Sequence, residues 1–134
     1  MTESPARIEG IGGVFLKANN PKALAEWYAR HFGLEFQSSA CGKAENFWLE
    51  FASGDHSQPD KRAATVFAIQ SAESVLPAER HAVEINYRVN DLGRLLAQLT
   101  AAGIKVEKRE DYEYGRFAWI RDLENNRIEL YQPA

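Results

Sequence analysis

Two glutamates lie inside strand-like segments that are otherwise mostly apolar, and a charge at such a position needs a reason. Glu84 belongs to HAVEINYRV (81–89), and Glu129 belongs to RIELYQ (127–132). Because successive side chains of a strand point to opposite faces, both glutamates should lie on the face that does not pack against helices. Their neighbours on that face are expected to be Asn86, Arg88 and Tyr131. The alternation therefore predicts a cavity in which Glu129 faces Glu84.

Three kinds of chemistry remain open for these two carboxylates. They can form ion pairs with Arg88 and Lys17 in a water-filled cavity. They can recognise a polar or cationic small molecule. They can also be catalytic, because two carboxylates close together do not both ionise cheaply, and the retained proton can serve a general acid or base. Such a pair can also hold a hard cation such as Mg²⁺ or Mn²⁺ if water or substrate completes the coordination shell.

Two segments in the first half of the chain should supply the rest of the cavity lining. They are RIEGIGGVFLKA (7–18) and ATVFAIQ (64–70). Their residues on the cavity face are expected to be Gly13, Phe15, Lys17, Val66, Ala68 and Gln70. Together with Tyr131, the apolar members would form about half of the lining, and charged or amide side chains the other half.

The segment EDYEYGRF carries two tyrosines that should share a face at the rim of the cavity. Tyr112 and Tyr114 would stack on a substrate or donate protons to it, or would pack against a partner subunit. Gly115 allows a turn or a bulge before the next strand. Trp48 and Trp119 are expected in the core or at a dimer interface.

The three histidines and the one cysteine do not complete a catalytic or metal site in this pattern. His31 falls at the end of a predicted helix, where a cation suits the helix dipole. His56 lies in a polar loop, and His81 begins a strand on the face opposite to the cavity. Cys41 has only Lys43 as a cationic neighbour in the sequence, so we expect it to be a bystander.

The same order of elements occurs twice along the chain. The first half is predicted to contain a strand (7–18), a helix (19–33) and three strands (34–40, 46–52, 64–70), with a mobile loop at 53–62. The second half is predicted to contain a strand (81–89), a helix (90–103) and three strands (104–110, 116–122, 127–132), with a turn at 123–126. Asn20 and Asp91 precede the helices, and Gly33 and Gly103 end them, so the two units are offset by about 70 residues.

This repeat predicts an α+β fold made of two βαβββ modules that form curved mixed sheets around a cavity, with the helices outside. The 134 residues would form one domain, with module one at 8–70, a linker at 71–80 and module two at 81–132. A concave inner face between two such sheets is a common place for a small-molecule pocket.

Composition narrows the possible partners. The net charge is −3, and no basic patch with interleaved aromatic residues is present, so nucleic acid is not an expected partner. The chain begins without a signal-peptide core and has no apolar run of membrane-spanning length, so we expect no membrane association. A single cysteine cannot form an intramolecular disulfide and fits a cytoplasmic protein. We expect a homodimer that binds a small molecule.

The chain resembles the vicinal oxygen chelate superfamily, which includes glyoxalase I, extradiol dioxygenases and bleomycin-resistance proteins. The resemblance covers about 8–132. It is most specific in PKALAEWYARHFGLEF, which is similar to the family's helix-to-strand signature, and in RDLENNRIELYQ. The latter is similar to the family pattern Asp-Pro-Glu-Gly-Asn-x-x-Glu-Leu, with Leu123 in place of the proline and Asn126 in place of the glycine.

The resemblance also implies where a divalent metal would bind in the metal-dependent members. The last strand of the second module gives a Glu, and Glu129 matches it. The first strand of that module usually gives a His, and the matching position is Glu84. The two positions in the first module match Gly13 and Ala68, which carry no ligand atoms in their side chains. We therefore expect no cofactor, although Glu84 and Glu129 would be the ligands if a divalent metal binds.

The resulting hypothesis is a small-molecule binding or lyase/isomerase-type protein of the glyoxalase and bleomycin-resistance kind, without the usual four-ligand metal site. Glu129 and Glu84 are its candidate catalytic residues. Its candidate ligand-binding residues are Lys17, Phe15, Asn86, Arg88, Tyr114 and Tyr131. One alternative is a metal-dependent glyoxalase or dioxygenase, and a second is a non-catalytic resistance protein that sequesters its ligand.

Overall fold

The computed structural model describes residues 6, 11, 13–41, 44–55, 58–78 and 80–134. Its elements follow the order β1 (Gly13–Ala18), α1 (Pro21–Phe32), β2 (Gln37–Cys41), β3 (Ala44–Asp55), β4 (Gln58–Ser71), β5 (Arg80–Arg88), α2 (Leu92–Ala101), β6 (Lys108–Tyr112), β7 (Gly115–Arg121) and β8 (Asn126–Pro133). The order βαβββ occurs twice, as the repeat in the sequence predicted.

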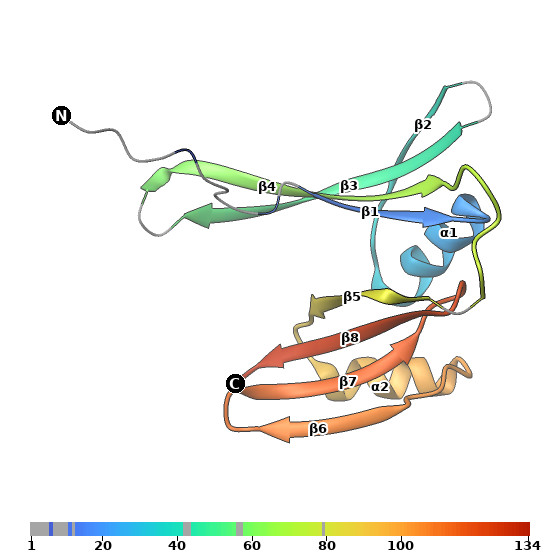
Figure 1. Cartoon of the computed structure of the whole chain (residues 1–134). Helices are drawn as coiled ribbons and strands as arrows, with labels where there is room; N and C mark the ends of the chain where they lie inside the picture. The colour runs from blue at the N-terminus through green and yellow to red at the C-terminus, as the bar shows by residue number, and fades with distance from the viewer. Residues whose placement is uncertain (1–5, 7–10, 12, 42–43, 56–57, 79) are drawn as a thin grey trace.

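The strands form two four-stranded mixed sheets, with the orders β1-β4-β3-β2 and β5-β8-β7-β6. In each sheet the first strand pairs in parallel with the last strand of its module, and the remaining pairs are antiparallel. The two sheets are not closed into a barrel, and β1 and β5 lie at the edges that face each other (Figure 1). The predicted α+β fold class is confirmed.

Helix α1 forms where the sequence supplies both of its end signals. The side chain of Asn20 accepts a hydrogen bond from the Ala23 amide at 3.1 Å, and Pro21 occupies the first helical turn. Gly33 ends the helix with a φ of 66°, in the left-handed region that favours glycine. One helical face buries Leu24, Ala25 and Tyr28 completely or nearly so.

Helix α2 is capped in the same way but ends differently. The Asp91 side chain accepts a hydrogen bond from the Arg94 amide at 3.0 Å. The helix ends at Ala101, and Gly103 follows with a φ of 84°. Its buried residues are Leu92, Leu96 and Leu99, while Leu95 is partly buried.

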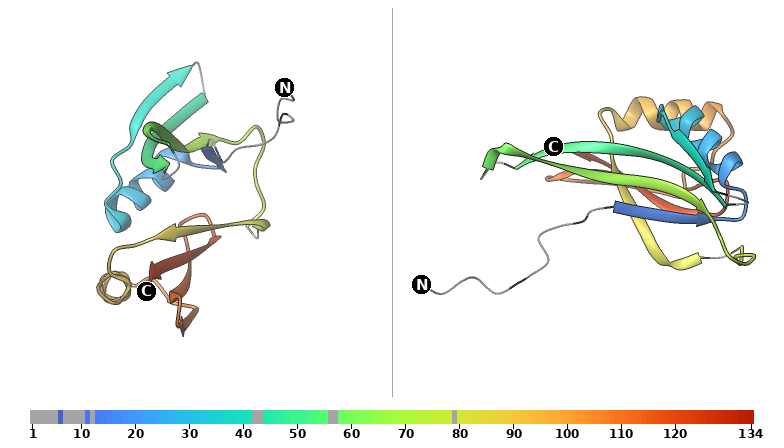
Figure 2. Two further views of the ribbon diagram at one scale, coloured as in Figure 1. Left: turned by 90° about the vertical axis from the view of Figure 1, so that its left-hand side faces the viewer. Right: turned by 90° about the horizontal axis from the view of Figure 1, so that it is seen from above.

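Both helices lie on the same side of the strands (Figure 2), and their apolar faces join the two sheets into one core. At the centre of this core, the ring of Tyr87 from β5 lies 5.8 Å from Phe67 of β4 and 6.0 Å from Tyr28 of α1. Since Phe67 and Tyr28 belong to the first module and Tyr87 to the second, these rings pack the modules against each other.

The predicted loop at 53–62 is wrong. The described part of this segment continues β3 and β4 as an antiparallel ribbon, in which Ser53 pairs with Ala63 and Gly54 with Arg62. The segment has no apolar residue, which is why the sequence indicated a loop. Antiparallel backbone pairing does not require an apolar face, so the hydrogen-bonded ladder extends beyond the part of the sheet that the helices cover.

Other corrections concern strand ends and turns. The strands β2 and β6 begin three and four residues later than predicted, at Gln37 and Lys108. Val83, which strand alternation places on the face of β5 opposite to Glu84, is 69% exposed instead of packed under the helices. In the turn before β8 the residue in the left-handed conformation is Asn125, with a φ of 67°, so Asn125 and not Asn126 takes the place of the glycine in the family pattern. Within the described residues, neither helix has the length and apolar character needed to cross a bilayer.

Candidate ligand-binding site

The face of the second sheet that points away from the helices carries the candidate site, and we call it the open face. Strand alternation and register place its residues, because every second side chain of each strand lies there. From β5 to β6 these residues are Glu84 and Asn86, then Arg127, Glu129 and Tyr131, then Phe117 and Trp119, then Lys108, Glu110 and Tyr112.

Glu129 is paired with Asn86 on this face. The two residues are register partners on the parallel strands β8 and β5. The Asn86 side-chain amide donates a hydrogen bond to one carboxylate oxygen of Glu129 at 2.6 Å. One oxygen of Glu129 is thereby oriented by a neutral donor, and the pair forms a polar centre on the same face as the aromatic residues Tyr131, Phe117 and Trp119.

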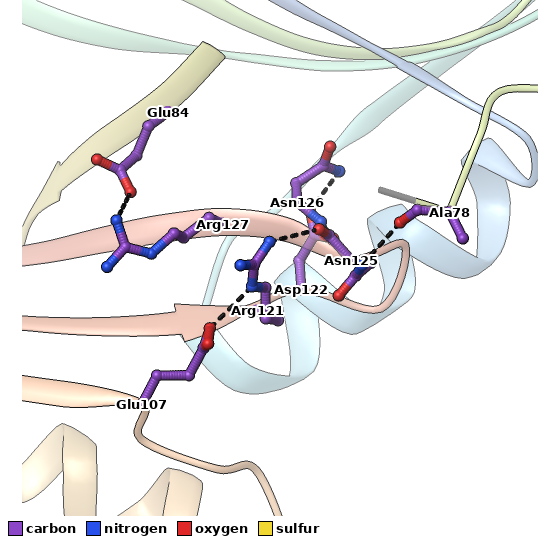
Figure 3. A network of polar contacts seen from close by, with 8 residues as sticks. All are labelled: Ala78, Glu84, Glu107, Arg121, Asp122, Asn125, Asn126 and Arg127. Atoms are coloured by element: carbon purple, nitrogen blue, oxygen red, sulfur yellow. Dashed lines mark hydrogen bonds and ion pairs between the residues drawn. The ribbon is translucent and has the colours of Figure 1, made fainter. Parts of the chain in front are cut away.

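Glu84 is engaged by a different residue. Its carboxylate lies 2.8 Å from the guanidinium of Arg127, and the two side chains are 38% and 37% exposed (Figure 3). The ion pairs considered from the sequence were with Arg88 and Lys17. The register explains the difference, because Arg127 precedes Ile128, the residue that pairs with Ile85. Glu84 is thus paired with Arg127, and the register partner of Glu129 is Asn86.

An array of stacked aromatic rings borders this polar centre. The rings of Phe117 and Tyr131 stack with their centroids 4.9 Å apart, and Trp119 stacks on Phe117 at 6.3 Å. Tyr112 and Tyr114 stack on each other at 5.2 Å, so they share a face as predicted. Phe117 did not emerge from the sequence as a candidate, although its position two residues before Trp119 on the same strand was a signal that could have found it.

Two cationic side chains lie close to the ring of Trp119. The ammonium of Lys108 lies 5.3 Å and the guanidinium of Arg127 lies 5.6 Å from the ring centroid. Only 9% of Trp119 remains exposed under these side chains. Trp119 is buried, as expected for a core residue. The side chains beside its ring are, however, charged residues of the open face.

The position of Tyr131 depends on Gly115, which is buried on the neighbouring strand. A Cβ added at residue 115 would lie 2.5 Å from the Tyr131 ring and 2.8 Å from the Gln132 carbonyl oxygen. Any other residue would therefore displace the ring or the strand. The sequence assigned Gly115 to a turn or bulge. In the structure it is needed because the backbone of β7 lies against the ring of Tyr131.

A buried aspartate shapes the turn that leads into β8 and so positions Glu129. Asp122 accepts hydrogen bonds from the backbone amides of Glu124 and Asn126, both at 2.9 Å. It also accepts from the Asn126 side chain at 2.8 Å and from the Tyr28 hydroxyl at 2.9 Å. Figure 3 shows this turn beside the chain at Ala78, whose carbonyl accepts from the Asn125 side chain at 2.7 Å.

The first sheet presents its own face away from the helices, and it is less polar. Phe15 is 54% exposed there, and its register partner Ala68 is buried between it and Trp48. The Lys17 ammonium donates a hydrogen bond to the Gln70 side chain at 2.6 Å. The structure thus places Phe15 and Lys17 on one face, as the alternation predicted.

A cavity of about 560 Å³ lies between the edge strands β1 and β5, and we call it the junction cavity. Phe15, Lys17 and Arg127 line it, together with apolar residues of both strands and the linker, namely Val14, Leu16, Leu76, Pro77, Val83 and Ile85. The junction cavity therefore brings two candidate residues of the first module, Phe15 and Lys17, beside Arg127 of the second module. Arg88 does not line it but lies at the end of β5, in a cavity described below.

The donor atoms present do not fit the metal site that the resemblance implies. Gly13 and Ala68 offer no side-chain ligand, and the guanidinium of Arg127 beside Glu84 would repel a cation. In the part of the chain that the structure describes, no three His, Cys, Asp or Glu residues are grouped to hold a metal. His31 is in contact with Trp27, at 5.0 Å between ring centroids. His56 and the side chain of His81 lie outside what the structure describes, as does the side chain of Cys41.

The environment of His31 also departs from the expectation of a helix-end cation. Burial, and then the charge of Arg30, lower the pKa of its imidazole. Both effects on the pKa of His31 act against the helix C-terminus, which would raise it.

Comparison with known protein families identifies the family of the chain. Residues 13–131 match the model of the glyoxalase-like domain, so the chain belongs to the glyoxalase-like domain family. No protein with a curated description matches the chain significantly in sequence.

Among solved structures, the chain is similar to TnmS3, an antibiotic binding protein from Streptomyces sp. CB03234, with 20% identity, 97% and 100% coverage of the two chains and a TM-score of 0.69. It is similar to the fosfomycin resistance protein FosX from Listeria monocytogenes, complexed with Mn(II) and sulfate (16% identity, 96% and 93% coverage, TM-score 0.64). It is also similar to lactoylglutathione lyase from Agrobacterium tumefaciens (18% identity, 95% and 96% coverage, TM-score 0.61). At these identities the likeness shows a common fold.

Proposed function

We propose that this chain is a small-molecule binding or lyase/isomerase-type protein of the glyoxalase and bleomycin-resistance kind, acting without the family's four-ligand metal site. The observation that carries the proposal is the Asn86–Glu129 hydrogen bond beside the stacked rings of Phe117 and Tyr131. An apolar surface with a few placed polar groups is what a small-molecule site requires.

In this proposal the rings receive a flat or apolar part of the ligand, and Glu129 provides the polar contact. The carboxylate oxygen that Asn86 does not bind would accept a hydrogen bond from a ligand N–H or O–H. If the protein is catalytic, the same oxygen would act as a general base, with Asn86 holding the carboxylate in position. Glu84 would tune this site through its ion pair with Arg127.

The remaining candidate residues have peripheral roles in the proposal. Phe15 and Lys17 border the junction cavity and would contact the part of a ligand that extends toward the first sheet. Tyr114, which is 64% exposed, would cover the ligand at the rim. Arg88 would attract anionic ligands from the end of β5.

A metal-dependent glyoxalase or dioxygenase is the alternative, and the similarity to a Mn(II)-bound FosX structure is its support. Metal analysis of protein purified without a tag separates the two functions, together with melting scans in Mn²⁺, Ni²⁺, Zn²⁺ and EDTA. We expect substoichiometric metal and a melting temperature that EDTA does not change. An equimolar bound metal, or a shift of several degrees on chelation, would overturn the metal-free proposal.

A non-catalytic protein that sequesters its ligand is the second alternative, and TnmS3, described as an antibiotic binding protein, gives it a precedent in fold. Such a protein would bind its ligand tightly without turnover. Its ligand binding would also be insensitive to Glu129→Gln.

The site itself is tested by ligand-observed NMR with a library of planar aromatic amines and amides. We expect binders whose saturation transfer is lost in Tyr131→Ala and whose affinity falls at least tenfold in Glu129→Gln. Glu113→Gln serves as the matched control, because Glu113 lies in the turn between β6 and β7. Equal binding by wild type and Tyr131→Ala would place the ligand elsewhere and contradict the proposal.

We also propose that the protein is a cytoplasmic homodimer. Exposed apolar residues near the junction cavity and the open face support an interface, notably Phe15 (54%), Val83 (69%) and Tyr114 (64%). The lone cysteine supports a reducing compartment. Light scattering across a range of protein concentrations would test the dimer, and a monomer at tens of micromolar would contradict it.

A further inference from the structure

A second cavity, of about 540 Å³, lies where the end of α1, the end of β5 and the first turn of α2 meet. We call it the arginine cavity, because Arg30 of α1, Arg88 of β5 and Arg94 of α2 all line it. Arg30 and Arg94 play no part in the open face or the junction cavity. The arginine cavity is therefore a separate feature, assembled from both modules.

The charge of the arginine cavity opposes that of the chain as a whole. Three arginines line it against a single acidic residue, Asp91, although the chain has a net charge of −3. The Asp91 carboxylate is engaged as the cap of α2, accepting from the Arg94 backbone amide at 3.0 Å. Within the described residues, none of the three guanidinium groups forms an ion pair or hydrogen bond. The positive charge is thus left without an internal partner.

The rest of the lining is suited to an organic group. Phe32, Leu34 and Leu95 belong to the partly buried apolar residues packed against the core, and Phe51 is 44% exposed. An apolar wall beside three guanidinium groups matches a molecule that has an anionic end and an apolar remainder. Guanidinium groups bind phosphate oxygens through two parallel hydrogen bonds, which a planar, permanently charged fork provides.

From this arrangement we propose that the arginine cavity binds a phosphate monoester that carries an apolar or aromatic group. The phosphate would lie among the guanidinium groups of Arg30, Arg88 and Arg94, and the organic group against Phe32 and Phe51. The first turn of α2 would add the favourable end of its helix dipole. The Leu92 and Arg94 amides already donate to Gln132 and Asp91, so the direct hydrogen bonds would come from side chains.

His31 provides a reporter inside the same cavity. Burial and the charge of Arg30 lower the pKa of its imidazole, and the other charged groups that line the cavity are Arg88, Asp91 and Arg94. A bound dianion would offset the three guanidinium charges and so raise the pKa of His31. Binding would also stabilise the fold, because the ligand would contact elements of both modules.

The test is calorimetric titration of the full chain with phenyl phosphate at low ionic strength. Inorganic phosphate and succinate are titrated separately for comparison. We expect phenyl phosphate to bind most tightly, and Arg30→Gln and Arg94→Gln each to weaken it at least tenfold. Arg109→Gln, on the exposed strand β6, is the matched control and should bind as wild type does. Arg30→Lys and Arg94→Lys keep the charge but lose the fork, and they replace the glutamine variants if those fail to fold.

Several results would overturn the proposal. One is that phenyl phosphate does not bind at millimolar concentration. Another is that Arg109→Gln weakens its binding as much as Arg30→Gln or Arg94→Gln does. A third is that succinate binds as tightly as phenyl phosphate. Inorganic phosphate binding as tightly as phenyl phosphate would remove the role of the apolar wall. An NMR titration in which phenyl phosphate leaves the pKa of His31 unchanged would place the anion elsewhere. Glu129→Gln should retain phenyl phosphate binding, so this site and the proposed function fail independently.

Discussion

Tyr28 of α1 donates a buried hydrogen bond to Asp122, 2.9 Å away at the end of β7. The contact joins the helix of the first module to the turn of the second across 94 residues of sequence. Since Asp122 also organises the turn that leads to Glu129, this bond connects the core to the candidate site. It gives the two modules a specific polar link in addition to their shared apolar core.

Tyr28→Phe should therefore destabilise the whole chain. The change leaves a buried carboxylate oxygen with one donor fewer, and we expect a loss of about 1–3 kcal/mol in the free energy of unfolding. Urea denaturation followed by circular dichroism would measure it. Tyr112→Phe, which removes a hydroxyl bonded to Glu110 at the surface, is the matched control and should change stability by less than about 0.5 kcal/mol.

We further propose that the modules unfold together as a single domain. One core cluster contains residues of both helices and both sheets, so separate melting of one module would expose apolar surface on the other. Calorimetric and van't Hoff enthalpies of unfolding should then agree. Two resolved transitions in wild-type protein would contradict a single domain, whatever the effect of Tyr28→Phe.

The two core tyrosines predict a loss of stability in alkali. Burial raises the pKa of Tyr28 well above its ordinary value, with the neighbouring Tyr87 and Asp122 adding to it, and burial also raises the pKa of Tyr87. A phenol whose pKa is higher in the folded than in the unfolded state stabilises the fold. This stabilisation is complete below the unfolded-state pKa, about 10, and is lost as pH rises toward the folded-state pKa. The urea midpoint should fall steeply above pH 10.

Substitution of these residues separates their titration from general alkaline damage. Tyr87→Phe should lose part of the pH dependence above pH 10, while Tyr114→Phe, an exposed position, should keep it. The readout is the urea midpoint between about pH 8 and 11, compared among the three proteins. The same slope in Tyr87→Phe and wild type would show that this phenol does not control alkaline stability.

Local signals in the sequence were enough to predict the fold. Pro21, Gly33 and Asp91 mark helix ends through interactions within a few residues, and the two helices begin and end close to where these residues predicted. Strand alternation likewise placed Glu129 and Asn86 on one face, because a period of two depends only on the strand itself.

The partners of the site residues could not be predicted in the same way. Whether Glu84 contacts Arg127 or Arg88 depends on the register of β5 against β8, which the packing of the core sets. The role of Gly115 depends on the ring of Tyr131, which belongs to a neighbouring strand. The ribbon at the ends of β3 and β4 was missed because backbone pairing leaves no apolar pattern in the sequence.

Gly115→Ala should disturb the open face, although the substitution adds only one methyl group. The added methyl group would lie 2.8 Å from a backbone carbonyl, which cannot move without the strand, and 2.5 Å from the Tyr131 ring. We expect destabilisation by about 1–3 kcal/mol and loss of aromatic-fragment binding. Gly93→Ala is the control, since its Cβ would meet only the Asp91 carboxylate at 3.8 Å and alanine favours a helix.

Asn86→Asp would place a second carboxylate against Glu129, whose oxygen is 2.6 Å from the present amide nitrogen. Like charges at this separation on a partly exposed face should destabilise the protein by about 1–2 kcal/mol at pH 7. The new pair would retain a proton more strongly when folded than when unfolded. The pair would therefore stabilise the folded state in acid, and this stabilisation would be lost as pH rises through the pKa of the pair in the folded state.

The variant should gain stability relative to wild type as pH falls from 7 to 5, which thermal melts in a common buffer series would show. Mn²⁺ is the complementary probe, because two adjacent carboxylates are suitable oxygen ligands for a hard cation. Mn²⁺ should therefore raise the melting temperature of Asn86→Asp and not that of wild type. Asn86→Leu, which removes the donor without adding charge, should respond to neither, so a pH or Mn²⁺ response in that variant would rule out the paired carboxylates as its cause.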